Sequence, residues 1–177
     1  MIAKILSACM VTGVSLLASP AMAGEIYGGV YAHAVDTPFT LDTQESGTDI
    51  QAGYRLDPVA GPLRLQPYVF GSVNSDGGTD FIGAGVGRKF SLGSLYVRPG
   101  VGLVVHNAPS TRVNPDTGYR TDLGSRVLFE PEIAVGTQIA PRLTLEASWV
   151  HISNARLFDR EQNPGIDMIG VRANLHL

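Results

Sequence analysis

Three residues near the end of the chain, His151, Ser153 and Asp167, have the types and the spacing of a serine-hydrolase site. Residues two apart on a β-strand point to the same side, with α-carbons roughly 6 to 7 Å apart, so the imidazole of His151 can reach the Ser153 hydroxyl. Asp167 lies on the next predicted strand, where its carboxylate can orient the imidazole across the pair. We therefore predict Ser153 as nucleophile, His151 as general base and Asp167 as the acid.

The neighbouring residues offer the remaining parts of an acyl-transfer site. Asn154 or a nearby backbone amide could donate a hydrogen bond to the oxyanion. Asp159 and Glu161 lie in the loop between the two strands and are alternative acids. His151 or Ser153 taken alone is better interpreted as an ordinary polar residue at the rim of a barrel, whereas the trio on one face favours a site.

Beyond residue 24, polar and apolar residues alternate with period two between clusters of turn-forming residues, and no helical periodicity is sustained. This pattern predicts an all-β chain. Most of the predicted strands have about the 9 to 11 residues that a tilted strand needs to cross a bilayer. They are 25–34, 47–56, 63–74, 79–90, 95–106, 125–139, 143–154 and 166–177.

The even number of strands and the alternation of short and long connections predict one domain, residues 24–177, folded as an eight-stranded antiparallel transmembrane β-barrel. Its location would be the bacterial outer membrane. A soluble barrel is the alternative, with its polar face turned outward. Opposite charges nearly balance on that face, as a packed lumen requires; they are Arg55, Arg64, Arg98, Arg172, Glu130, Glu132 and Glu146.

Proline occurs inside three predicted strands, at Pro67, Pro99 and Pro131. Proline cannot donate a hydrogen bond to a neighbouring strand, so each of these positions is expected to form a β-bulge or to lie outside its strand.

Residues 1–23 have the features of a secretory signal peptide: Lys4, an apolar run and the small-x-small sequence Ala21-Met22-Ala23. Cleavage there would remove Cys9, the only cysteine, and would leave no disulfide. Leu6-Ser7-Ala8-Cys9 also resembles a lipoprotein box, but cleavage there would leave almost no apolar segment before the cysteine.

The net charge of −3 gives no indication of a nucleic-acid partner. The other histidines, His33, His106 and His176, lie on separate strands without metal-ligand spacing, so we predict no metal and place them in the lumen or at the rim. The sequence also implies no cofactor, and it leaves a homodimer open.

The segment His151-Ile152-Ser153-Asn154, followed by an Asn-Pro-Gly turn and an acidic residue, resembles the outer-membrane lipid A 3-O-deacylases of the PagL type. The resemblance covers most of the chain after residue 24. It implies His151 and Ser153 as catalytic base and nucleophile, Asn154 as the asparagine tied to the oxyanion hole, and lipid A in lipopolysaccharide as the substrate. Asp167 falls where the family usually has glutamate.

The alternation of the last two strands places His151, Ser153 and Asp167 on the apolar outer wall, near the extracellular end. Polar groups on a lipid-facing wall are costly unless they have a function, so a lipid ester is the expected substrate. Two alternatives remain: a non-catalytic structural or adhesive barrel, and an acyltransferase with the same nucleophile.

Overall fold

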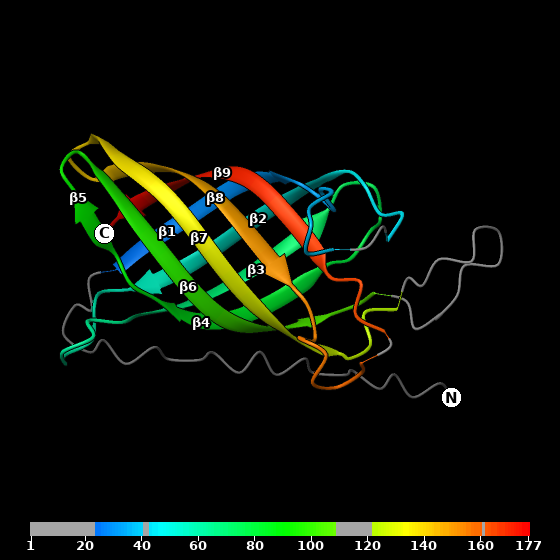
Figure 1. Ribbon diagram of the computed structural model, residues 1–177. Helices are drawn as coiled ribbons and strands as arrows, with labels where there is room; N and C mark the ends of the chain where they lie inside the picture. Colours follow the sequence, from blue (N-terminus) through cyan, green and yellow to red (C-terminus); the bar gives the residue numbers. More distant parts are fainter. Residues whose placement is uncertain (1–23, 41–42, 109–121, 161) are drawn as a thin grey trace, which may run out of the picture.

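The computed structural model describes residues 24–40, 43–108, 122–160 and 162–177. The signal peptide predicted for residues 1–23 and the alternative acid Glu161 lie outside these ranges. In the described residues the chain forms an antiparallel sheet (Figure 1). Its strands are β1 Gly24–Ala32, β2 Thr48–Leu56, β3 Gln66–Asn74, β4 Phe81–Gly87, β5 Phe90–Leu92, β6 Leu95–His106, β7 Val127–Ala140, β8 Leu143–Ile152 and β9 Ile166–His176.

The sheet closes on itself because β4 pairs with β6 in addition to β3. β5 pairs with β6 in the same register as β4, so β4 and β5 together form one strand of the wall. The fold is therefore a closed eight-stranded antiparallel β-barrel, as predicted from the alternation. Among the described residues, no helix is long and apolar enough to cross a membrane.

Pro99 explains the interruption between β4 and β5. The backbone N–H of Arg88 donates to the Pro99 carbonyl over 3.0 Å, but Pro99 has no N–H with which to return the bond. Pro67 and Pro131 lie in unbroken register, opposite Val86 and Val101 respectively. The prediction that each proline forms a bulge or lies outside its strand is therefore wrong, because all three lie inside strands that contain no extra residue there.

Tyrosines fill the narrow lumen by lying over glycines on the adjacent strand. Tyr68 is the direct cross-strand partner of Gly85, and a Cβ added at Gly85 would lie 2.5 Å from the tyrosine hydroxyl oxygen. Tyr96 and Gly136 form the same arrangement between β6 and β7. Glycine is required on this face because any larger residue would occupy the space of a ring.

The lumen also holds buried, paired charges. Arg172 donates to Glu132 over 2.7 Å and to Glu146 over 2.5 Å, and Arg55 and Arg98 share Glu25. The predicted lumen position of Arg64 is wrong, because β3 begins only at Gln66 and Arg64 lies exposed in the preceding turn.

The outer wall carries the apolar side chains. Large exposed residues line every side of it, including Ile26, Val69, Val101, Val135 and Val171. An apolar exterior around a charged interior suits a lipid environment and would be unfavourable in water. The soluble barrel considered above is therefore wrong.

The two ends of the barrel differ in their connections. The end that carries the C-terminus has two tight turns, at 93–94 and 141–142, and a somewhat longer one (Figure 1). The other end has mostly long connections, at 33–47, 107–126 and 153–165. The end of β8 and the start of β9 lie at this long-loop end, with the predicted site residues.

Candidate active site

β8 and β9 bring His151 and Asp167 face to face as direct cross-strand partners, in agreement with the pairing inferred from the hairpin. The Nδ1 atom of His151 lies 2.7 Å from Asp167 Oδ1, and its Nε2 atom lies 2.9 Å from Ser153 Oγ. The imidazole thus connects a hydroxyl and a carboxylate through its two ring nitrogens. This is the geometry that serine hydrolases use to activate a serine.

Ser153 lies one residue beyond the end of β8, yet its backbone is fixed. Its N–H donates to the Phe129 carbonyl over 3.1 Å, and its carbonyl accepts from the Phe129 N–H over 2.8 Å. The chain then turns sharply, with Ala155 and Arg156 both at positive φ. Left-handed backbone at consecutive non-glycine residues is strained and often marks functional sites. Ser153 is therefore held at the point where the rigid wall ends.

Asp167 has the expected strand position but not the expected surroundings. The alternation placed it on the lipid-facing wall, whereas its side chain is fully buried. The first part of the connection between β1 and β2, residues 33–40, folds over it: the Thr37 hydroxyl donates to Asp167 Oδ2, and the Val35 N–H donates to the Asp167 carbonyl over 2.9 Å. The prediction of a lipid-facing acid is wrong because this loop covers it.

The Asn-Pro-Gly turn before β9 packs directly on the imidazole. Gly165 has a φ of +70°, and a Cβ built there would lie 3.0 Å from His151 Cε1. Only glycine combines this backbone conformation with so close an approach to the ring. Asn163 accepts a hydrogen bond from the Asn154 N–H over 2.8 Å. Neither contact was inferred from the sequence, although the turn motif itself could be recognised there.

Asn154 is fully buried and connects two loops. Its side-chain amide donates to the carbonyls of Leu123 and Gln162 over 3.0 and 2.7 Å, and its Oδ1 accepts from the Arg156 N–H over 2.7 Å. Both amide hydrogens and the backbone N–H thus have acceptors within the protein. Donation to an oxyanion would require one of these bonds to be exchanged, so the oxyanion role of Asn154 stays a prediction.

Aromatic rings flank the site on both sides. On one side Phe39 lies against Trp149, whose ring centroid is 6.1 Å from that of His151. On the other side Phe129 stacks on Phe158 with ring centroids 6.0 Å apart. Phe39 and Phe158 are largely exposed. These rings extend the apolar surface up to the edge of the polar site.

The two ring nitrogens of His151 face Asp167 and Ser153 rather than the alternative acid Asp159. Its carboxylate instead accepts the Gln162 N–H over 3.0 Å, within the β8–β9 connection. In the part of the chain that the structure describes, no three histidine, cysteine or acidic side chains are grouped so as to hold a metal ion.

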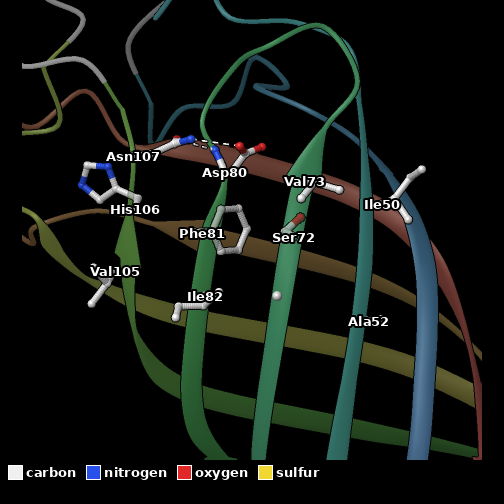
Figure 2. A pocket seen from close by; sticks show the side chains of 11 residues that line it. Ile50, Ala52, Ser72, Val73, Asp80, Phe81, Ile82, Val105, His106 and Asn107 are labelled. Atoms are coloured by element: carbon white, nitrogen blue, oxygen red, sulfur yellow. Dashed lines mark hydrogen bonds between the residues drawn. The ribbon is translucent and has the colours of Figure 1, made fainter. Parts of the chain in front are cut away.

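A hollow of about 570 Å³ lies away from the trio, on the wall formed by β2, β3, β4 and β6 (Figure 2). The small residues Ala52 and Gly71 leave this space between the larger side chains of Ile50, Val73 and Ile82. Its lining is mostly apolar and contains none of the three predicted catalytic residues. The cross-strand geometry of β8 and β9, rather than this hollow, therefore defines the candidate site.

Solved structures of several transmembrane barrels resemble this chain. The crystal structure of the outer membrane enzyme PagL is 18% identical, with a TM-score of 0.61, and the match covers 86% of this chain and 99% of that chain. A de novo designed transmembrane β-barrel is 12% identical, with a TM-score of 0.54 and coverage of 90% and 98%. The N-terminal barrel of Pseudomonas aeruginosa OprF is 10% identical, with a TM-score of 0.54 and coverage of 87% and 99%. These similarities establish an outer-membrane-type barrel fold.

The family model described as lipid A 3-O-deacylase (PagL) matches residues 51–176. The chain belongs to this family, whose members remove an acyl chain from lipid A, and it is a bacterial outer-membrane protein. No curated protein sequence matches it. The homodimer left open by the sequence has no support among these findings.

Proposed function

We propose that this protein hydrolyses the ester-linked 3-hydroxyacyl chain of lipid A in the outer leaflet of the outer membrane, with Ser153 as nucleophile, His151 as general base and Asp167 as the acid. The observation that carries the proposal is the pair of hydrogen bonds from the His151 ring, to Ser153 Oγ at 2.9 Å and to Asp167 Oδ1 at 2.7 Å. Membership of the lipid A 3-O-deacylase family supplies the substrate class.

In the first half of the reaction, His151 Nε2 takes the proton from Ser153 Oγ while the oxygen attacks the ester carbonyl carbon. The resulting oxyanion intermediate collapses, the bond to the lipid A 3-oxygen breaks, and His151 returns the proton to that oxygen. Asp167 stabilises the imidazolium through Nδ1, and its burial makes this interaction stronger than it would be in water. The products of this half are deacylated lipid A and an acylated Ser153.

In the second half, water replaces lipid A. His151 Nε2 takes a proton from a water molecule as its oxygen attacks the acyl-serine carbonyl, and then returns that proton to Ser153 Oγ. The free 3-hydroxy fatty acid leaves, and all three side chains regain their starting protonation states. The protein groups alone can therefore carry the proton transfers of the cycle.

Asn154 enters this mechanism as a residue that positions the loops, because its amide hydrogens are already bonded to the Leu123 and Gln162 carbonyls. It ties the segment after Ser153 to the later part of its own connection, at Gln162, and to the connection between β6 and β7, at Leu123. Loss of this amide would free the chain that follows the nucleophile.

The substrate's position follows from the wall below the site. Short turns and termini of such barrels lie in the periplasm, so the long-loop end faces outward, where lipopolysaccharide is found. His151 lies at that end of an apolar wall and has a small exposed surface, with 13% of its side chain accessible. Acyl chains can lie along the wall while the ester reaches the serine.

Covalent labelling tests the nucleophile directly. The purified barrel, folded in detergent micelles, is treated with a fluorophosphonate, and the modified peptide is identified by mass spectrometry. We expect labelling at Ser153 and its loss in His151→Ala. Ser91, an exposed serine on β5 near the opposite end of the barrel, is the internal control. Equal modification of Ser91 and Ser153 would favour a non-catalytic barrel.

A further inference from the structure

The loop that covers Asp167 also orders it. Each oxygen of the Asp167 carboxylate has one side-chain partner: Oδ1 bonds His151 Nδ1, and Oδ2 accepts the Thr37 hydroxyl. With both oxygens held, the carboxylate cannot rotate about its Cβ–Cγ bond without losing a hydrogen bond. This matters for a buried carboxylate, which has little water to replace a lost partner.

The direction of the Thr37 hydrogen bond is fixed by its surroundings. Thr37 Oγ1 accepts the Phe39 N–H over 3.1 Å, and an ionised carboxylate has no hydrogen to donate. The single hydroxyl hydrogen of Thr37 must therefore point to Asp167. A hydroxyl that accepts from Phe39 while it donates to Asp167 is held in one orientation by the two hydrogen bonds.

The loop that carries Thr37 is anchored at both ends. At its base the His33 N–H donates to the Gly47 carbonyl over 3.1 Å, and the His33 ring lies 2.9 Å from Asp49 and 2.8 Å from Glu45. Two residues after His33, the Val35 N–H donates to the Asp167 carbonyl. Thr37 is therefore held against the acid by contacts that do not depend on its own hydroxyl.

We propose that Thr37 is a positioning residue of the active site, which orients the Asp167 carboxylate toward His151. This proposal rests on the function proposed above. Removal of the hydroxyl should slow the chemical step without weakening the binding of lipid, since Thr37 contacts the acid rather than the serine.

The test compares Thr37→Val, which keeps the shape and loses the hydroxyl, with Thr37→Ser, which keeps the hydroxyl. We expect Thr37→Val to lower kcat for lipid A deacylation in micelles about tenfold, as for one lost hydrogen bond to a charged group, with KM within about twofold. Thr37→Ser should retain most of the activity. Thr40→Val makes the same chemical change in the same loop while the Thr37–Asp167 bond is kept, and should behave as the parent.

The only tryptophan of the chain reports on the loop itself. Trp149 lies against Phe39 of this loop, with ring centroids 5.9 Å apart, so its fluorescence registers whether the loop stays in place. We expect an unchanged spectrum in Thr37→Val. If Thr37→Ser is as slow as Thr37→Val, or if the two variants share a shifted spectrum and the same loss, the loop acts by packing alone and the proposal is overturned.

A double-variant cycle separates this inference from the function on which it rests. In an Asp167→Asn background, Thr37→Val should cause no further loss, because the group that it positions is already changed. A second tenfold loss would mean that Thr37 acts elsewhere, and parent-like activity in Thr37→Val would also overturn the proposal. Activity that survives in Ser153→Ala would instead contradict the proposed catalytic serine.

Discussion

Asp167→Asn is the substitution that probes the proposed triad most closely, because it keeps the size of a fully buried side chain and changes only its hydrogen-bonding character. The Thr37 hydroxyl donates to Oδ2 and so favours the amide oxygen at that position. The amide nitrogen then faces His151 Nδ1 and donates to it. The imidazole must accept at Nδ1 and carry its proton on Nε2, where it can no longer take the proton of Ser153.

The expected loss of activity has two causes. The imidazole is held in the wrong tautomer, and the negative charge that stabilises the imidazolium is removed. The same change in a serine protease triad lowers kcat by about 10⁴-fold, which corresponds to about 5 kcal/mol of activation free energy, and we expect a loss of this order. The assay is the initial rate of fatty acid release from lipid A by the purified protein in micelles. Thermal unfolding of the same samples shows whether the fold is retained.

Asp159→Asn and Glu161→Gln are the matched controls, because both change an acid of the same connection. Asp159 bonds Gln162 rather than His151, and we expect each control to stay within a few-fold of the parent. A loss below tenfold in folded Asp167→Asn, or a larger loss in either control, would mean that Asp167 is not the acid.

Two further predictions concern the barrel and its loop. Gly85→Ala should destabilise the barrel by about 1–3 kcal/mol, because the added Cβ would lie 2.5 Å from the Tyr68 hydroxyl oxygen. Gly71→Ala is the control: the nearest atom to its added Cβ is 3.6 Å away, so its unfolding in urea should be close to that of the parent. Equal effects of the two substitutions would contradict the packing of tyrosine over glycine. Burial lowers the pKa of His33, but its hydrogen bonds with Asp49 and Glu45 outweigh burial and raise the pKa to about 9. Because the pKa of His33 is higher in the folded state, its hydrogen bonds stabilise the fold fully below the unfolded-state pKa near 6.5, and this stabilisation is lost as the pH rises through about 9. Trp149 fluorescence should therefore change near pH 9 in the parent and not in His33→Gln. The same transition in both proteins would exclude His33 as its cause.

Local pattern in the sequence determines the barrel and the central pair of the site. Alternation defines the strands, and a hairpin between adjacent strands fixes the register, so the pairing of His151 with Asp167 follows without any long-range information. The position of Arg64 could not be obtained in this way. The start of β3 depends on how the preceding turn is built, and the predicted strand began three residues too early.

The surroundings of the site depend on contacts between distant parts of the chain. Thr37 is 130 residues from Asp167, and nothing in the strand pattern indicates that the first long loop folds over the last strand. One partner of the Asn154 amide, the Leu123 carbonyl, is likewise supplied by another loop. Loop conformation is set by such long-range hydrogen bonds and packing, which periodicity does not encode.

The most direct test of the central claim is mass spectrometry of lipid A from cells that express this protein or its Ser153→Ala variant, with insertion of both in the outer membrane confirmed. The proposed function predicts loss of one 3-hydroxyacyl chain with the parent and intact lipid A with the variant. Intact lipid A with both would contradict the proposed activity, and the same loss of an acyl chain with both would contradict Ser153 as the nucleophile.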